Sequence, residues 1–507
     1  MRKISSVLIF PTAIGPEIGL HFVPGKVTWN PSWRRAAQVL CADHANCLSV
    51  MKASNFPLGK APLVMAILMV VSALSLAVGH QRERKTLTLW VFARTHYDDY
   101  MTSKAEFERQ HPGWKVEVKL TDGAALVNRL LAAFIAGRGA PDVTEVEISS
   151  IGRFFKGPIE EIGFVDLTER FRREGYLDAI PAARFTPWMT RGHIFGCPED
   201  LHPVILLYRE DLFRRWDARA HGWVKIDLPK EVKLWSDFVR VGQEVMRDSD
   251  ARGEPVRYPI ALFKNQWWSF WILLLQRGGG MFDERGNVII DQPVAVDTLQ
   301  FLTDLFNKGK IAWPVEDLPS LWAAANQDQV MSVLAPDWFV GFVKDNCSKQ
   351  AGKWRAMPLP AFEPGGRRVS SHGGTTMCIP KQCPNPEMAW ELIRFFYLNH
   401  DVVVERVPKT RVMPALNSAY TDRRLLTYED PFLGGQRVAA LFGSLKDDIP
   451  RIHQTPYWAE AQVLLQQAVF NAIEGYQTPQ EALGRIRRRL EKDVGRYRTI
   501  EGELTAR

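Results

Sequence analysis

The stretch TLTLWVFARTHYDDYMTSKAEFERQHPGWKVEVKL (residues 86–120) contains two alternating strand patterns on either side of one helical pattern. Its two ends alternate apolar and polar residues, as half-buried strands do, and the residues between them are typical of a helix. ALVNRLLAAFIAG (125–137) then has apolar residues at helical spacing, and PDVTEVE (141–147) predicts a third strand. The order strand, helix, strand, helix, strand predicts an α/β fold with a parallel sheet covered by helices.

Further strands and helices are expected downstream of this region. VILLYR (204–209) predicts an apolar strand that leads into a helix, and GMFDERGNVII (280–290) predicts a hairpin. Asp291 is the expected N-cap of the next helix, and QVMSVLAPDW (329–338) predicts a strand that ends in a loop. The remaining expected elements are a strand within 372–381, a helix over 385–398 and a basic helical tail from Pro456.

Upstream lies an uncharged apolar segment, APLVMAILMVVSALSLAVG (61–79). Read from Met51, with two lysines before it and a small-x-small site at 77–79, the segment is typical of a secretory signal peptide. An uncleaved membrane anchor is the alternative, because about twenty apolar residues also suffice to span a bilayer. Both readings place the rest of the chain outside the cytoplasmic membrane, in the periplasm or at the outer face. The predicted segments are an extension or incorrectly assigned start at 1–50, and a signal peptide or anchor with its linker at 51–85.

Charge and composition narrow the class of function. The whole net charge of +7 lies in residues 1–85, so the chain from Thr86 onward is neutral. A nucleic-acid partner is therefore not expected. Roughly 420 residues remain beyond the leader, which is too long for one ordinary core and predicts two lobes. The seventeen tryptophans suit core packing, but a flat indole also stacks against the apolar faces of sugar rings.

The cysteines and histidines suggest a disulfide but no metal site. Four cysteines follow the leader, and an exported chain can be oxidised, so we expect a disulfide between Cys378 and Cys383. The histidines are scattered without the spacing of metal ligands. Neither a metal nor a cofactor is expected.

Four blocks in this order carry a resemblance to a known family. The most specific is GGGMFDERGNVIIDQPVAVDTLQFLTDLFNKG (278–309), and the others are APDVTEVEISSIGRF (140–154), GHIFGCPEDLHPVILLYREDLF (192–213) and HGGTTMCIPKQCPNPEMAWELIRFF (372–396). The chain from Leu87 to about Asp493 resembles the family 1 extracellular solute-binding proteins of ABC sugar importers, the relatives of maltose-binding protein. The resemblance implies a type II periplasmic-binding-protein fold, in which two lobes, each a mixed sheet flanked by helices, hold a ligand in the cleft between them.

The resemblance also implies a hinge that the chain crosses about three times, near 197–200, 371–375 and 412–415. With these crossings, lobe I comprises residues 86–198 plus 376–412, and lobe II comprises 199–375 plus 413–500. The implied partners are a carbohydrate, expected to be an oligosaccharide, and the permease subunits of an ABC importer. The protein itself is expected to act as a monomer.

The candidate ligand-binding residues lie at strand ends and at the hinge, where ligands of open α/β sheets bind. Indoles can stack on sugar rings, carboxylates accept hydrogen bonds from hydroxyls, and glycines let backbone N–H groups approach. The structural alternatives are packing within a lobe for the tryptophans, helix capping for Glu147 and a hinge role for the glycines. The candidates are Trp338, Asp337, Glu147, Trp267, Trp268, Gly373, Gly374, Asp200, His202, Trp90, Arg94 and His96.

Two other classes of function remain as alternatives. A secreted sensory or interaction module could use the same fold. A carbohydrate-active enzyme would need a pair of carboxylates, such as Glu145/Glu147, Glu160/Glu161 or Glu199/Asp200, but a chain of this length offers several such pairs by chance. The sequence contains no Gly-x-Ser-x-Gly elbow, phosphate loop or zinc motif, so we predict a binding protein without catalytic residues.

Overall fold

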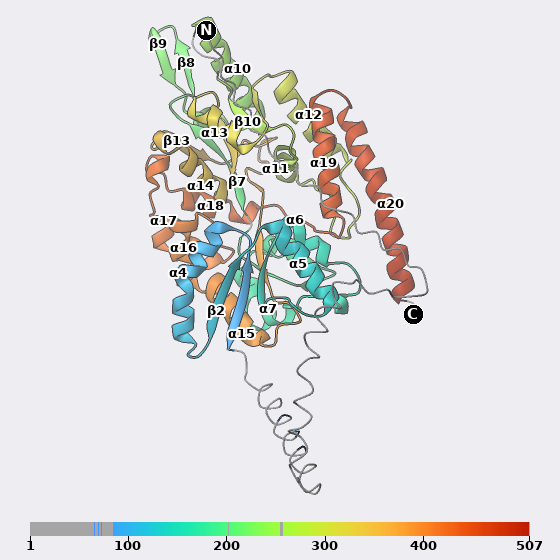
Figure 1. Ribbon diagram of the computed structural model, residues 1–507. Coiled ribbons are helices and arrows are strands. Elements are labelled where there is room, and N and C mark those ends of the chain that lie inside the picture. The colour runs from blue at the N-terminus through green and yellow to red at the C-terminus, as the bar shows by residue number, and fades with distance from the viewer. Residues whose placement is uncertain are drawn as a thin grey trace, which may run out of the picture. The chain divides into compact units, whose positions relative to one another are not determined.

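A computed structural model describes residues 65, 69, 72 and 85–505, apart from 201 and 254–256, and for 495–505 it gives only the course of the backbone (Figure 1). The described residues from 85 onward belong to one compact unit, to which the following description applies. The predictions for 1–50 and, apart from residues 65, 69 and 72, for the apolar segment 61–79 lie outside the described residues. Among the helices described, none combines the length and the apolar character that a membrane span requires.

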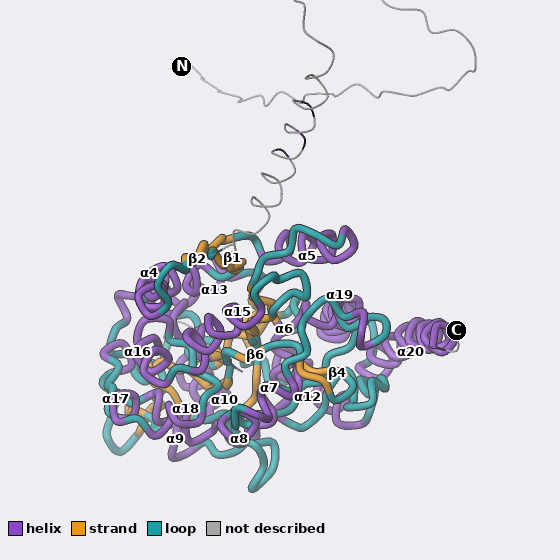
Figure 2. The backbone as a smooth tube through the Cα atoms, turned by 90° about the horizontal axis from the view of Figure 1, so that it is seen from below, coloured by secondary structure: helices purple, strands orange, loops and turns teal. Residues whose placement is uncertain are grey.

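The first sheet contains the strands predicted from the opening stretch. Its order is β2-β1-β3-β15-β6, with β1 parallel to both β2 and β3, and β15 antiparallel to β3 and β6. Helices α4 (Arg94–Gln110) and α5 (Gly123–Ala136) connect the first three strands and lie on opposite sides of β1 and β2 in Figures 1 and 2. The predicted strand–helix–strand–helix–strand order is therefore confirmed. The strands are β1 (Thr86–Val91), β2 (Lys115–Leu120), β3 (Val143–Glu147), β6 (Cys197–Pro198) and β15 (Thr375–Cys378).

The second sheet has the order β11-β10-β12-β7-β13, and β14 pairs with β7. Strand β7 is antiparallel to β12 and β13, so this sheet is mixed, whereas β10 is parallel to both of its neighbours. The strands are β7 (Pro203–Arg209), β10 (Ile260–Phe263), β11 (Ala312–Val315), β12 (Ser332–Pro336), β13 (Trp354–Met357) and β14 (Ser370–Ser371). Its helices are α10 (Trp235–Ala251), α11 (Trp268–Gln276), α12 (Pro293–Asn307), α13 (Leu318–Asn326) and α14 (Asp337–Asn346). Two mixed sheets, each flanked by helices, correspond to the predicted α/β fold class.

The chain passes between the two sheets at short connections that hydrogen-bond to one another. Residues 199–202 join β6 to β7, and 372–374 join β14 to β15. The backbone N–H of Glu199 donates to the Thr375 carbonyl at 3.0 Å, and that of Ala415 donates to the Glu199 carbonyl at 2.7 Å. The segment after α16 (His400–Thr410) thus runs beside the other two connections. The lobe boundaries given above remain a prediction.

The C-terminal part of the chain is mostly helical, as predicted. The helix expected over 385–398 forms as α15 (Pro386–Ile393) and continues as one π-helical turn over 394–398. The predicted helical tail forms α19 (Trp458–Ile473) and α20 (Pro479–Thr505), which contact each other and α12.

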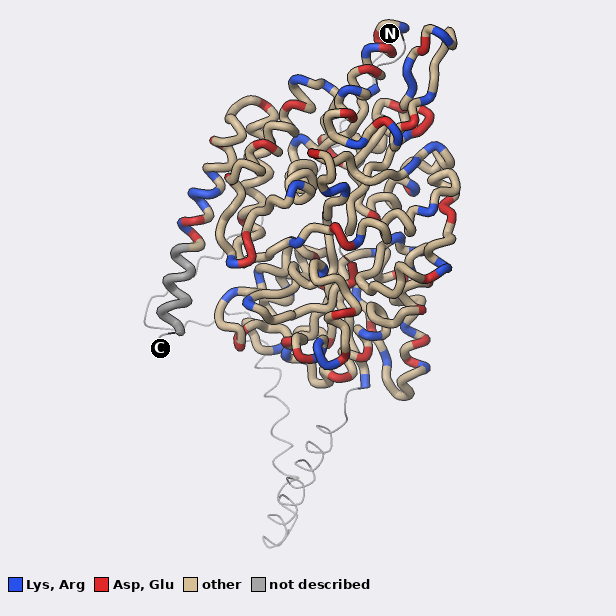
Figure 3. Tube along the Cα trace, turned by 180° about the vertical axis from the view of Figure 1, so that it is seen from behind, with Lys and Arg blue, Asp and Glu red and all other residues tan. Residues whose placement is uncertain are grey.

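The shorter helices of the chain are α6 (Ile148–Ile151), α7 (Thr168–Arg173), α8 (Tyr176–Ala179), α9 (Leu228–Glu231), α17 (Arg423–Leu426) and α18 (Val438–Leu445). Figure 3 shows acidic and basic residues interspersed over the described chain.

Three local predictions are wrong. The helix expected after β7 is a hairpin of β8 (Arg214–Asp217) and β9 (Gly222–Lys225), where the cross-strand pair Trp216–Trp223 stabilises the turn. Asp291 does not cap α12, because Pro293 fixes the start of that helix and makes Gln292 the N-cap. No loop follows β12, since α14 begins at Asp337 itself. The hairpin expected at 280–290 does form, although it is short: Phe282 and Val288 make an antiparallel bridge, and the N–H groups of Asp283 and Ile289 donate to the carbonyls of Asn287 and Met281, each at 3.0 Å.

The predicted disulfide is also not formed. Cys378, Cys197 and Cys347 are buried free thiols. Cys378 ends strand β15 and points to the backbone of Gly196, whereas the Sγ atom of Cys383 lies 3.7 Å from a carboxylate oxygen of Asp142. The two side chains of the predicted pair therefore pack against different neighbours.

Candidate functional site

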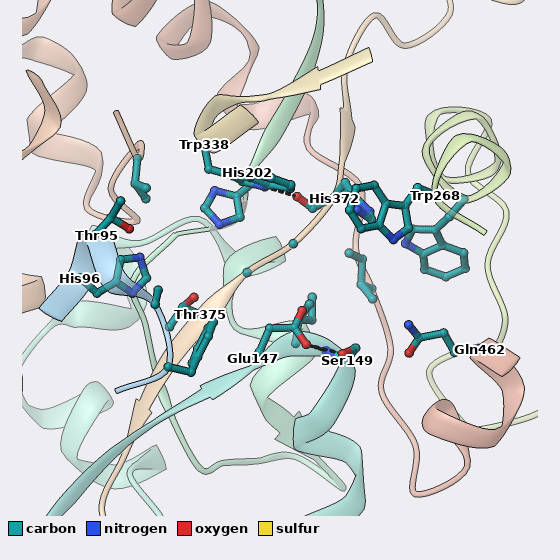
Figure 4. Close-up of a pocket in the computed structure, with 18 of the residues that line it drawn as sticks. Thr95, His96, Glu147, Ser149, His202, Trp268, Trp338, His372, Thr375 and Gln462 are labelled. Carbon is teal, nitrogen blue, oxygen red and sulfur yellow. Dashed lines mark hydrogen bonds between the residues drawn. The ribbon is translucent and has the colours of Figure 1, made fainter. Parts of the chain in front are cut away.

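A cavity of about 370 Å³ lies where the connections between the two sheets meet (Figure 4). It receives residues from the end of β1, the end of β3, the first turns of α11 and α14, and the start of α19. Because these elements belong to both sheets, a ligand in the cavity would contact both. The predicted site residues that line it are Trp338, Glu147, Trp267, Trp268, Gly373, Gly374, His202 and His96.

Tryptophans form the apolar wall of the cavity. In Figure 4 the indoles of Trp338 and Trp268 lie across the cavity from Glu147 and Ser149. The two rings meet edge to face with centroids 6.3 Å apart, and the Trp338 Nε1–H group donates to the His372 carbonyl at 3.1 Å. Both indoles are only partly buried, so each is held by the protein and still offers a face to the cavity.

Trp267 is more deeply packed than Trp268. The sequence alone does not indicate which of these two tryptophans packs in the core. Trp267 is 7% exposed and meets the ring of Trp458 edge to face at 6.0 Å. Trp271, one helical turn further along α11, contacts Trp458 with ring centroids 4.7 Å apart. These three rings form the packed end of the cavity.

Glu147 provides the acidic group of the cavity. It ends β3 and is the N-cap of α6, where its carboxylate accepts a hydrogen bond from the Ser149 N–H group at 2.8 Å. Burial raises the pKa of Glu147, and the bonds from Ser149 oppose this rise. The side chain therefore serves both the cap and the cavity wall.

His202 is held by two carboxylates that do not reach the cavity. Its Nδ1 atom lies 2.5 Å from Asp337, and its Nε2 atom lies 3.3 Å from Asp200. Asp337 also accepts from the Met413 N–H group at 2.6 Å, and Asp200 accepts from the Thr375 N–H group at 3.0 Å. Both carboxylates are at most 1% exposed and stand behind the wall, where they tie the connections between the sheets together.

A second buried ionic network supports His96. The Nδ1 atom of His96 lies 2.9 Å from Glu145 and 3.6 Å from Glu199, and Arg406 lies 3.3 Å from Glu199. Burial opposes the charge on His96, but Glu199 and Glu145 outweigh burial and raise its pKa to about 10. Since Nδ1 is taken by Glu145, the protonated ring has its Nε2–H group left for the cavity.

The ligand atoms of His96, Glu145 and Glu199 lie within 4.8 Å of one another, which is close enough for a metal ion. However, the cations His96 and Arg406 already neutralise these carboxylates, and a metal would have to displace a proton held with a pKa of about 10. The group fits an ion-pair network better than a metal centre. The expectation of no metal remains a prediction.

Besides Asp337 and Asp200, two further predicted site residues do not line the cavity. Trp90 lies in β1 and is partly buried away from it. Arg94 begins α4 with a side chain that is 72% exposed and paired with Asp98 at 3.0 Å. The end of β1 instead contributes Phe92 and Thr95, together with His96.

Several cavity residues were not among the predicted ones. Trp271 follows Trp267 by one helical turn, so its place on the same face could have been read from the sequence. His372 adjoins the predicted glycines. No local sequence pattern indicated a role in binding for Ile452, Gln454, Trp458 and Gln462. These residues reach the cavity from a part of the chain far from the other elements.

Gly373 is required at the cavity wall for a steric reason. Its φ is +94°, and a Cβ atom there would lie 2.7 Å from the His202 ring and 3.0 Å from Trp338 Nε1. We expect Gly373→Ala to lower the free energy of unfolding by about 1–3 kcal/mol in urea denaturation. Gly139 has the same φ, but a Cβ atom added there would meet no other atom within 4 Å. Gly139→Ala is therefore the matched control and should lower the free energy of unfolding by less. Equal losses in the two variants would contradict the close contact.

The buried histidines predict a dependence of stability on pH. Burial opposes the charge on His202, but Asp200 and Asp337 raise its pKa to about 9, while burial raises the pKa of Asp200 itself to about 7. An unfolded histidine titrates near pH 6.5. The stabilisation from His202 is therefore complete below pH 6.5 and is lost as the pH rises through about 9.

We expect the free energy of unfolding to fall between about pH 7 and 10, by on the order of 3 kcal/mol for His202. Urea titrations at each pH should show a shallower fall for His202→Gln. His193 pairs with Asp166 at the surface, so His193→Gln is a control that should keep the wild-type slope. A pH slope that His202→Gln leaves unchanged would contradict the assignment.

The fold and the cavity define a two-lobed α/β binding protein, and the comparisons agree. The chain belongs to the family described as bacterial extracellular solute-binding protein, whose sequence profile matches residues 95–400. Proteins of this family are binding proteins that act outside the cytoplasm with ABC transporters. This agrees with the predicted family and with the predicted extracytoplasmic location.

Two relatives are known as arabinooligosaccharide-binding proteins. That of Bacillus subtilis (strain 168) is 27% identical over 434 residues, which are 83% of this chain and 96% of the relative. That of Halalkalibacterium halodurans is 23% identical over 421 residues, which are 80% of this chain and 89% of the relative.

Solved structures share the fold. The sugar-binding protein MalE from Xanthomonas citri has a TM-score of 0.67 at 18% identity, covering 82% of this chain and 98% of its own. An ABC transporter associated binding protein from B. animalis subsp. lactis Bl-04, in complex with beta-1,6-galactobiose, has a TM-score of 0.63 at 18% identity with the same coverage of both chains.

Proposed function

We propose that this protein captures an oligosaccharide outside the cytoplasmic membrane and delivers it to the permease of an ABC importer, acting as a monomer. The observation that carries the proposal is the cavity between the two sheets, with exposed faces of Trp338 and Trp268 on one side and Glu147 on the other. Flat apolar faces opposite a hydrogen-bonding wall suit a sugar ring, which has apolar faces and polar edges. Arabino-oligosaccharides are the first candidates, because the named relatives bind them.

Reversible binding fits the site better than catalysis. Glu145 would have to be the second carboxylate beside Glu147, but it accepts hydrogen bonds from Tyr100 at 2.8 Å and from the Phe92 N–H group at 3.2 Å, besides its contact with His96. Its side chain is fully buried and is occupied by these partners. We therefore assign no catalytic residue and no cofactor. Export through the segment 61–79, cleaved or kept as an anchor, is part of the proposal.

Titration calorimetry of the protein from Thr86 onward with arabinose and with arabino-oligosaccharides of two to four units tests the proposal, with chromatography of the sugars afterwards. We expect saturable binding and recovery of the intact sugar. Binding of none of these sugars would contradict the arabino-oligosaccharide proposal, and a shortened product would contradict the assignment as a binding protein.

A further inference from the structure

The segment 449–457 runs along one side of the aromatic cavity and contacts residues that precede β6 in the chain. The Ile452 N–H group donates to the Thr186 hydroxyl at 3.2 Å, and Gly152 leaves no room for a Cβ against the Thr455 carbonyl. The segment then enters α19, which packs against α12 beside the second sheet. We call residues 449–457 the strap, because they connect the two sides of the cavity away from the hinge.

Side chains of the strap line the aromatic cavity and two neighbouring cavities of about 960 and 480 Å³. Ile452 and Gln454 line the aromatic cavity, whereas Arg451 and His453 line only the two neighbouring ones. Ile452 also lines the larger neighbouring cavity, and Gln454 lines the smaller one, so the strap stands at the junction between the three spaces.

Polar atoms at this junction lack partners in the part of the chain that the structure describes. Gln454 is 7% exposed, yet neither its amide oxygen nor its amide nitrogen meets a hydrogen-bonding group. The indole Nε1 of Trp458, four residues on and 2% exposed, also has no partner there. Buried polar groups are nearly always hydrogen-bonded in native proteins, so two exceptions that line the same cavity point to partners from a ligand.

We infer that Gln454 and Trp458 recognise the hydroxyl groups of a second sugar unit, adjacent to the unit that stacks on Trp338. An amide presents one acceptor and two donors in a plane, and an indole adds one donor, which together match neighbouring hydroxyls of a ring. A ligand that reaches the junction continues toward the smaller neighbouring cavity. The inference rests on the proposed function and specifies it: the site selects a chain of at least two units over a single sugar.

Gln454→Met tests the inference, because methionine keeps the length of the side chain and removes both polar atoms. By calorimetry we expect the wild type to bind arabinotriose more tightly than arabinose, and the variant to lose about tenfold in affinity for arabinotriose. Since the amide has no partner in the free protein, the melting temperature of the unliganded variant should stay the same or rise. Trp458→Phe removes the Nε1–H group together with one ring of the indole, and it should weaken arabinotriose binding about threefold.

Gln350→Met is the matched control. Gln350 is 5% exposed, and its amide group donates to the Ala325 carbonyl at 2.7 Å and accepts from Trp354 Nε1 at 2.9 Å. This variant should lose stability and keep its affinity, the opposite of Gln454→Met.

Unchanged arabinotriose affinity in both Gln454→Met and Trp458→Phe would overturn the inference, as would a wild type that binds arabinose as tightly as arabinotriose. In either case the proposed function would stand. A wild type that binds none of these sugars would refute the proposal for arabino-oligosaccharides, and the inference with it.

Discussion

Trp338→Ala should weaken oligosaccharide binding about thirtyfold, which corresponds to about 2 kcal/mol, as for a central aromatic anchor. The indole offers one face to the cavity while its Nε1–H group is fixed on the His372 carbonyl, so the substitution removes a positioned stacking surface. Stability should fall by less than the roughly 3–5 kcal/mol of a fully buried tryptophan, because Trp338 is only partly buried. Calorimetry and thermal unfolding of the same preparation measure both effects.

Trp322→Ala is the control for this experiment. Trp322 is also partly buried, packs against Phe339 with ring centroids 5.4 Å apart and does not line the aromatic cavity. It should lose stability and bind as the wild type does. If Trp338→Ala behaves in the same way, Trp338 is a packing residue and the proposed stacking is wrong.

Arg406→Met should have the largest effect on stability, a loss of about 3–5 kcal/mol in the free energy of unfolding. Arg406 is 5% exposed and lies 3.3 Å from Glu199 and 3.9 Å from Asp99, with its guanidinium 5.4 Å from the Tyr397 ring centroid. Burial disfavours its charge, but Glu199 leads the groups that raise the pKa of Arg406, so the side chain remains charged. Methionine would fill part of the space and leave two buried carboxylates without this cation.

Arg424→Met separates the effect of burial from that of charge. Arg424 also pairs with two carboxylates, those of Asp422 and Asp401, but its side chain is 47% exposed. Its replacement should change stability little, since water screens surface pairs. Equal losses for Arg406→Met and Arg424→Met in urea denaturation would contradict the larger contribution assigned to the buried network.

The fold could be predicted where local patterns and tertiary packing agree. The alternation in β2 and the helical spacing of α5 reflect elements with one more buried face, while in β1 the alternating apolar residues mark the fully buried face of a central strand. The hairpin β8–β9 was missed because its stability comes from a cross-strand tryptophan pair rather than from apolar alternation. The helical start at Asp337 was missed because a strand end followed by two polar or aromatic residues is equally typical of a loop.

The site could be predicted only in part, for related reasons. Trp338, Glu147 and Gly373 stand at strand ends or connections, where topology alone indicates a ligand. Asp337 and Asp200 occupy similar positions in the sequence, yet their side chains turn back to His202 and to backbone N–H groups. Gln454 and Trp458 reach the cavity from a segment more than a hundred residues beyond β12, so only tertiary packing reveals them.

A crystal structure of the protein grown with arabinotriose would show whether an oligosaccharide binds between the two sheets. We expect electron density for one sugar ring against the Trp338 indole, with the next ring within hydrogen-bonding distance of Gln454. Clear density for the sugar at another place on the protein, with the aromatic cavity filled only by water, would contradict this expectation.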